Sequence, residues 1–134
     1  MGYYALGMIR IFIGHFGEAV DSLLRSLRLS PNDALAGFHV GWVALADYHQ
    51  DKYEEAVGHA ERALRGRRWP YVLRTLIASL GQLERADEAR TALAELERFK
   101  PIDAARYWQV TSPYADPAHG AHLDEGLRKA GMRI

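Results

Sequence analysis

The segment YEEAVGHAERAL, residues 53–64, places Glu55 four residues before His59. On a helix this spacing would bring the two side chains together, one turn apart. A carboxylate beside an imidazole could act as an acid–base pair or supply two ligands of a metal site. A metal site needs a third protein ligand, and none follows at a typical spacing. We therefore interpret Glu55 and His59 as a surface pair worth about 0.3 kcal/mol.

A second pair of candidate ligands lies near the C-terminal end, in DPAHGAHLDE. His119 and His122 are three residues apart, with Asp116 and Asp124 close by in the sequence. Two imidazoles and a carboxylate on one helical face could bind a transition metal. Gly120 lies between the histidines and weakens a helix there. The favoured interpretation is a polar face at a helix start, and a metal-binding enzyme using His119 and His122 is a remote alternative.

Other chemistry has little support in the sequence. Arg65, Arg67 and Arg68 form a basic cluster that would complement the negative end of a helix. Contact with a phosphate or an acidic peptide is the alternative for this cluster. The sequence contains no Cys and no nucleophile elbow, phosphate loop or zinc-protease motif. We therefore expect no catalysis and no cofactor.

The charge balance limits the classes of partner. Lys plus Arg and Asp plus Glu both number 17, so the formal net charge is zero. A general nucleic-acid binder needs a basic excess, and a neutral chain lacks the repulsion that opposes self-association. The most apolar opening stretch, residues 3–13, contains Arg10 and is too short to span a bilayer. We expect no nucleic-acid partner, no membrane partner and a cytoplasmic location.

One pattern recurs three times along the chain. The three copies are FGEAVDSLLRSLRLSP at 16–31, YEEAVGHAERALRGRR at 53–68 and ADEARTALAELERFKP at 86–101. Their Glu–Ala pairs end at Ala19, Ala56 and Ala89, at intervals of 37 and 33 residues. These intervals are close to the period of about 34 residues that is typical of helix–turn–helix repeats.

Helical periodicity and helix-stop signals divide the chain into short helices. First helices are expected at 2–14, 34–49 and 71–82, and second helices at 17–29, 53–66 and 86–99. Pro70 favours a helix start between the second and third copies. The tail adds expected helices at 103–110 and 118–130. The prediction is an all-α single domain of residues 1–134, with repeats at 2–33, 34–69 and 70–101 and a capping region at 102–134.

These residues resemble the tetratricopeptide repeat (TPR). The likeness rests on a bulky residue followed by Glu-Ala, small residues, a Leu and then Pro, and on small residues such as Gly7 and Ala44 in the first helices. The phrase LIASLGQLERADEARTALAEL is also similar to the C-terminal TPR region of bacterial adenylate-cyclase-like regulatory proteins. The resemblance implies a TPR-like α-solenoid of antiparallel helix pairs, with a regulatory or scaffold role in a larger signalling protein.

Packing explains why such a pattern would exist. On helix 53–66 one apolar stripe runs along the helix, made of Tyr53, Ala56, Val57, Ala60, Ala63 and Leu64. Stacked neighbours can bury such a stripe, and a lone hairpin cannot. In the last helix Leu123, Leu127 and Ala130 would face the array as a cap. The apolar start of the chain has no such cap, so we expect either a preceding domain or a second copy to cover it.

The family resemblance implies that first helices line a concave groove. The groove predicted on that basis contains Tyr4, Met8, Ile11, Phe38, Leu45, Tyr48, Tyr71, Arg74 and Gln82. Its aromatic and Met side chains would suit an apolar helix or extended peptide. The predicted function is therefore a non-enzymatic protein–protein interaction module. The alternative is a self-associating structural module, joined through the uncapped N-terminal helices.

Overall fold

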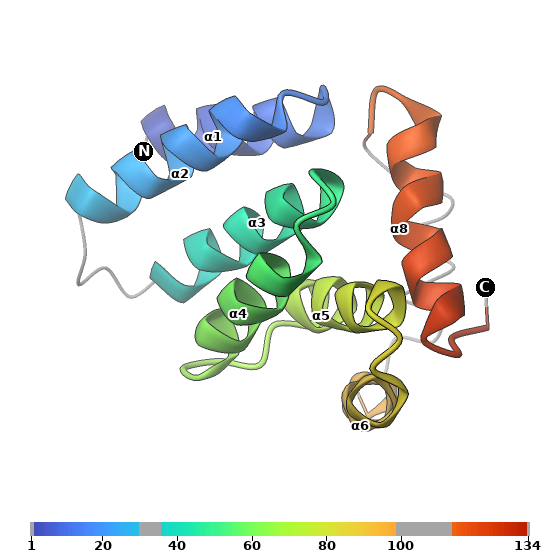
Figure 1. Ribbon diagram of the computed structural model, residues 1–134. Coiled ribbons are helices and arrows are strands. Elements are labelled where there is room, and N and C mark those ends of the chain that lie inside the picture. The colour runs from blue at the N-terminus through green and yellow to red at the C-terminus, as the bar shows by residue number, and fades with distance from the viewer. Residues whose placement is uncertain (1, 30–35, 99–113, 134) are drawn as a thin grey trace.

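Helices make up most of the chain in the part that the structure describes (Figure 1). This computed structural model describes residues 2–29, 36–98 and 114–133, with side chains from residue 6 onward. Seven helices lie in these ranges, and no strand does: α1 (Gly2–Phe12), α2 (Phe16–Leu29), α3 (Ala36–His49), α4 (Tyr53–Leu64), α5 (Pro70–Gln82), α6 (Ala86–Glu97) and α8 (Pro117–Lys129). The all-α prediction is confirmed, and these helices begin and end within two residues of the expected positions. The helix expected at 103–110 lies outside the described residues.

The turns inside the three predicted repeats have the same backbone geometry. Gly14, Asp51 and Glu84 each follow a first helix and have φ of 92°, 62° and 58°. The next residue then donates its backbone N–H to the carbonyl five residues earlier, as in His15 to Arg10 at 2.7 Å and Arg85 to Leu80 at 3.0 Å. This bond is the 6→1 bond of a Schellman motif, which ends a helix at a left-handed residue. The three turns recur at the same intervals as the Glu–Ala pairs.

Local chemistry also explains two helix starts. Pro70 occupies the first turn of α5, where its missing N–H leaves no helical hydrogen bond unmade. Asp116 precedes α8, and its side chain accepts a hydrogen bond from the backbone N–H of Ala118 at 2.9 Å. Such a cap satisfies one of the backbone donors that a helix start leaves open.

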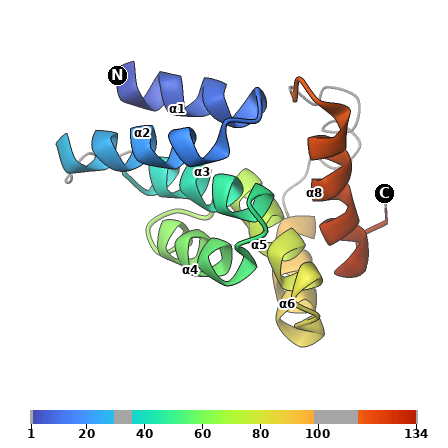
Figure 2. The same cartoon turned by 45° about the horizontal axis from the view of Figure 1, so that its top comes forward.

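Neighbouring helices in the sequence are neighbours in space. Each helix from α1 to α5 contacts the next one, and α3 also contacts both α1 and α5 (Figures 1 and 2). The alanines of the three Glu–Ala pairs, Ala19, Ala56 and Ala89, have no exposed surface. Small side chains at these places let the helices approach closely. In α4 the predicted stripe is buried apart from Tyr53, which is partly exposed.

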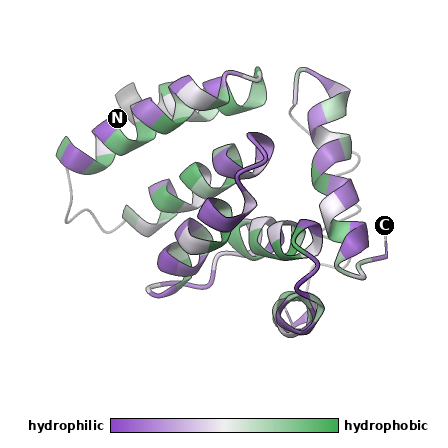
Figure 3. Ribbon diagram, in the orientation of Figure 1, coloured by the Kyte–Doolittle hydropathy of each residue, from purple (hydrophilic) through white to green (hydrophobic). Residues whose placement is uncertain are grey.

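The helices differ in how much of their circumference is buried. Every residue from His39 to His49 in α3 and from Val72 to Gly81 in α5 is buried, so these two helices form the centre. The other helices are amphipathic, and bands of hydrophilic and hydrophobic residues alternate along α2 and α8 in Figure 3. The core therefore lies on α3 and α5, with the remaining helices around them.

Helix α8 packs against α5 and, more lightly, against α3 (Figure 1). Leu123 and Leu127 are buried in this contact, as the sequence predicts, and Ala130 is partly buried, whereas Arg128 and Lys129 are exposed. Two glycines make the close approach possible. A side chain at Gly81 would meet the backbone of Gly126 and Ala130, and one at Gly126 would meet Ala78 O at 2.6 Å. This helix therefore covers one end of α5.

Candidate functional site

The nine residues predicted for the groove differ in how accessible they are. Ile11, Leu45, Tyr48 and Arg74 are buried, whereas Met8, Phe38, Tyr71 and Gln82 are partly exposed. Tyr4 belongs to α1, but its side chain lies outside the described residues. Of the eight predicted groove residues whose side chains the structure describes, the four buried ones present almost no surface to a partner.

An aromatic row crosses α1, α3 and the start of α5. We define it as Phe12, Trp42, Phe38, Tyr71 and Trp69. The ring centroids of Phe12 and Trp42 are 5.6 Å apart, and those of Trp42 and Tyr71 are 4.8 Å apart. Phe38 adds contacts of 5.3 Å to Tyr71 and 5.1 Å to Trp69. These spacings are in the attractive range for aromatic pairs. Trp42 is buried, and the other four rings are partly exposed.

One hydrogen bond and one glycine position Tyr71 within the row. The Tyr71 hydroxyl donates to the backbone carbonyl of Phe38 at 2.5 Å, which ties α5 to α3. Gly41 gives the Tyr71 ring its space, because a Cβ there would lie 3.0 Å from the ring carbon that carries the hydroxyl. The row therefore joins α5 to α3 through ring contacts and a hydrogen bond.

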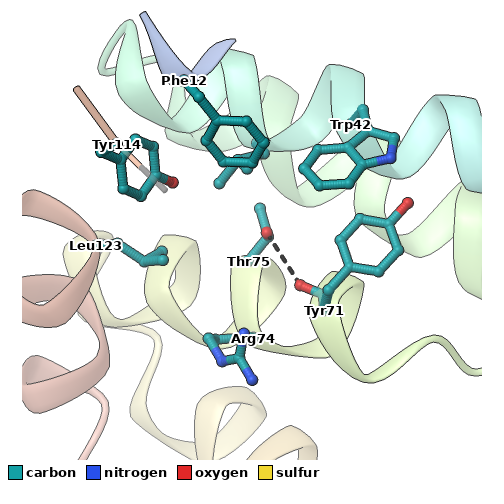
Figure 4. Close-up of a pocket in the computed structure, with 8 residues that line it drawn as sticks. Phe12, Trp42, Tyr71, Arg74, Thr75, Tyr114 and Leu123 are labelled. Atoms are coloured by element: carbon teal, nitrogen blue, oxygen red, sulfur yellow. Dashed lines mark hydrogen bonds between the residues drawn. The ribbon is translucent and has the colours of Figure 1, made fainter. Parts of the chain in front are cut away.

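A small cavity lies beside the row (Figure 4). Its volume is about 20 Å³, enough for one water molecule and far below that of a typical ligand pocket. Figure 4 shows Phe12, Trp42 and Tyr71 of the row among its lining residues, together with Tyr114, Leu123 and Thr75. A cavity of this size is too small to hold an organic ligand.

Arg74 also lines this cavity, although it is a charged residue and is buried. Burial lowers the pKa of its guanidinium to about 10, and Tyr114 and Asp124 act in the opposite direction. Burial also raises the pKa of the Tyr114 hydroxyl. Arg74 is thus a buried cation at the junction of α5 and α8, not an exposed groove residue.

At its other end the predicted groove is covered by α8. The Tyr48 hydroxyl donates to the backbone carbonyl of His122 and accepts from Nε2 of Gln82 at 3.1 Å. Oε1 of Gln82 in turn accepts from Nζ of Lys129 at 2.9 Å. Burial raises the pKa of the Tyr48 hydroxyl, so it stays protonated and able to donate. Tyr48 and Gln82 hold α8 rather than facing an open groove.

Three histidines meet where α3 and α8 come together. The ring centroid of His49 lies 5.8 Å from that of His119 and 5.5 Å from that of His122. His49 shares a hydrogen bond of 2.7 Å with the Tyr114 hydroxyl, and His122 shares one of 2.8 Å with the Tyr53 hydroxyl. Phe16 of α2 stacks on His49 at 4.9 Å. The cluster therefore joins four helices.

The histidine cluster is built for packing more than for charge. Burial is the largest cause that lowers the pKa of His49, to about 3, and the nearby His122 and His119 lower it further. Burial also lowers the pKa of His122, although Asp51 and Glu125 oppose it. Among the described residues no group of three or more His, Asp or Glu side chains is placed to hold a metal ion. His119 contacts Phe16 and His122 contacts Tyr53, so each histidine packs against its own aromatic neighbour.

His59 has a different partner from the one expected. Its Nδ1 lies 2.6 Å from the Asp47 carboxylate of α3, and the described residues contain no ion pair between His59 and Glu55. The interpretation of Glu55 and His59 as a surface pair is therefore wrong. The hydrogen bond that the Asp47 carboxylate accepts is the largest cause that raises the pKa of His59. The two side chains therefore form an ion pair when His59 is protonated.

The basic cluster is also divided. Arg68 forms a bidentate contact with Glu95 of α6, at 2.7 Å from Nε and 2.6 Å from Nη2. The Arg67 guanidinium lies 4.4 Å from the centre of the Trp69 ring, and Arg65 is exposed. One of the three arginines, Arg68, thus forms an ion pair that links the connection between α4 and α5 to α6.

Sequence reasoning missed several residues of this surface. Phe12, Trp42 and Trp69 belong to the aromatic row but were not among the predicted groove residues. Trp42 follows Phe38 by four residues, so helical spacing alone could have indicated a shared face. Tyr114 lies within the turn-rich stretch TSPYADP, which has no helical spacing that could indicate its contacts.

Comparisons with protein-family models, with curated proteins and with solved structures found no match for this chain. In the described residues no helix combines the length and the apolar character needed to cross a membrane.

Proposed function

We propose that this protein is a non-catalytic protein–protein interaction module, an array of three TPR-like helix pairs that binds an apolar peptide or helix on the aromatic row. Three observations support the array: the repeated turn geometry, the buried Glu–Ala alanines, and the contact of α1, α3 and α5 in series. The part played by this module in a larger signalling protein stays a prediction.

The observation that carries the binding function is the partial exposure of the aromatic row. Phe12, Phe38, Tyr71 and Trp69 are rigid apolar rings that water still reaches. Aromatic side chains lose little conformational entropy on binding and bury a large area, so they are common at the centres of interfaces. Met8 of α1 is also partly exposed and can adapt to the shape of a partner.

Selection from a displayed peptide library tests this function. Peptides enriched on the purified protein should carry two or more large apolar residues at helical or alternate spacing, and binding can be measured by fluorescence anisotropy. Phe38→Ala should weaken the selected peptides by about tenfold or more, the effect of losing one interface anchor. Phe16→Ala is the control, since Phe16 is also partly exposed but packs on His49 away from the row. Equal weakening by both variants, or a selection that enriches no peptides with large apolar residues, would contradict the proposal.

A second candidate is self-association through α1. Leu6, Ile9 and Ile13 are 38%, 56% and 48% exposed and lie on one face of α1 or just after it, at a spacing of three and four residues. This face could pair with the same face of a second copy and bury all three side chains. Sedimentation at increasing protein concentration decides the question. Ile9→Glu with Ile13→Glu should convert a dimer to a monomer while Phe38→Ala leaves it dimeric, and a wild-type monomer at high concentration rules this candidate out.

A further inference from the structure

A hollow of about 390 Å³ lies between the start of α3 and the end of α4, and it is separate from the cavity beside Thr75. Four of its lining residues have small side chains or none: Ala36, Gly37, Ala63 and Gly66. Helices α3 and α4 come close here, since a Cβ at Gly37 would lie 3.2 Å from the carbonyl oxygen of Ala63. These four residues have no long side chains that could fill the hollow.

Two of the residues that line this hollow are positively charged. Arg62 and Arg67 line it and both are exposed, and among the described residues no carboxylate lines it. In the described part of the chain neither arginine forms an ion pair. The Arg67 guanidinium is instead held 4.4 Å above the centre of the Trp69 ring. A cation stacked in this way stays available to bind an anion through its N–H groups.

A neighbouring hollow provides an internal comparison. It measures about 370 Å³, lies on the other side of α4, and contains Arg65 and Arg68. Glu61 also lines it, and Arg68 is already paired with Glu95 at 2.6 Å. The two hollows are similar in size, but in the described part of the chain a carboxylate lines the hollow of Arg65 and Arg68 and none lines the hollow of Arg62 and Arg67.

We propose that the hollow of Arg62, Arg67 and Trp69 binds an acidic peptide segment of a partner protein. Two carboxylates would each accept paired N–H bonds from one guanidinium, which is the strongest geometry for such contacts. The four small lining residues and Trp69 would contact the apolar stems of the same segment. A free phosphate would leave most of the hollow empty, and the neutral chain lacks the wider basic surface that nucleic acid requires.

This inference is independent of peptide binding on the aromatic row, although Trp69 belongs to both surfaces. It is tested with a fluorescent peptide of alternating Glu and Leu and a matched peptide of alternating Gln and Leu. The protein should bind the acidic peptide at least about tenfold more tightly at low salt, and the preference should shrink as salt is raised. Equal binding of both peptides would overturn the proposal.

Variants locate the binding. Arg62→Gln with Arg67→Gln should weaken the acidic peptide by about tenfold or more, the size expected for losing two charge-assisted contacts. Arg65→Gln with Arg98→Gln makes the same change in net charge outside the hollow and should alter binding by less than about twofold. All four side chains are exposed, so both variants should keep the helical circular dichroism of the parent. An equal loss in the two variants would overturn the proposal, since it would show attraction by net charge alone.

Two competitors identify the occupant. Inorganic phosphate should displace the acidic peptide only as strongly as other salts do at equal ionic strength. A short single-stranded RNA of equal charge should not displace it. Specific displacement by either would show a different ligand and would overturn the assignment to an acidic peptide.

Discussion

The carboxylate of Asp47 in α3 lies 2.6 Å from Nδ1 of His59 in α4. Asp47 is buried and His59 is partly exposed, so the bond joins the centre of the fold to its surface. A buried carboxylate is costly unless it is paired, and Asp47 is paired with His59. The pair therefore fixes how α4 is rotated against α3.

Asp47→Ala should lower the free energy of unfolding by about 2 kcal/mol, because His59 loses its partner and a buried site loses its hydrogen bond. Glu55→Ala should change it by less than about 0.5 kcal/mol, since Glu55 is an exposed residue. Urea unfolding followed by circular dichroism measures both. Equal effects of the two substitutions would mean that His59 pairs with Glu55 in solution.

The same pair predicts a dependence on pH. Asp47 raises the pKa of His59 above its ordinary value of 6.5. The charged form of His59 is therefore favoured in the folded state. This stabilisation is complete at a pH below the pKa that His59 has in the unfolded chain, and it is lost as the pH rises through the pKa that His59 has in the folded protein. The destabilisation caused by Asp47→Ala should therefore be larger at about pH 6 than at about pH 9. A larger effect at the higher pH would contradict the assignment.

His49 predicts the opposite dependence in acid. Burial lowers its folded pKa from 6.5 to about 3, so the unfolded chain binds more protons between these values. Stability is then highest above the unfolded pKa and falls as pH drops through the window from 6.5 toward 3. The slope from this one residue should reach about 1.4 kcal/mol per pH unit.

Unfolding measured across this window tests the role of His49. His49→Gln keeps a polar group near the Tyr114 hydroxyl but cannot be protonated in this range, so its stability should depend less steeply on pH. His15→Gln is the control, because His15 is exposed. A pH dependence that His49→Gln leaves unchanged would show that other groups cause the loss of stability in acid.

The sequence is sufficient to predict the helices because their signals are local. The apolar spacing of residues 53–64, Pro70 at a helix start and the three Glu–Ala pairs each act within a few turns of chain. The Asp47–His59 bond is not a local signal. It depends on the rotation of one helix against another, and residue types twelve positions apart do not reveal that rotation. The nearer Glu55 was therefore the natural but incorrect partner.

The candidate site was predictable only in part for a similar reason. Phe38 and Tyr71 follow from their places on first helices, and both belong to the aromatic row. Tyr48 shares the helix of Phe38, but α8 covers it through a hydrogen bond to His122. Which groove residues stay open therefore depends on where a distant helix packs, and the sequence pattern does not encode that position.

The turn at Glu84 offers a stabilising substitution. Glu84 has a φ of 58°, in the left-handed region where residues other than Gly are strained. Gly14 fills the equivalent position of the first repeat with a φ of 92°. Glu84→Gly should raise the free energy of unfolding by up to about 1 kcal/mol, less the entropy that Gly costs in the unfolded chain. Thermal unfolding measures the change, and a clear loss of stability would contradict this turn geometry.

The α5–α8 contact gives the sharpest test of the fold around the site. A Cβ at Gly81 would lie 2.9 Å from the backbone nitrogen of Ala130 and would also meet the backbone of Gly126, and backbone atoms cannot turn aside as a flexible side chain can. Gly81→Ala should therefore lower the free energy of unfolding by about 2 kcal/mol or separate α8 from α5. Gly58→Ala is the matched control, because Gly58 also lies inside a helix but has nothing within 4 Å of its Cβ position. This control should gain about 1 kcal/mol from helix propensity.

Urea unfolding gives both values, and proteolysis within residues 114–133 reports separation of α8. If Gly81→Ala gained stability like Gly58→Ala without exposing that segment, α8 could not pack on α5 as described, and the half of the groove around Tyr48 and Gln82 would be open to a partner.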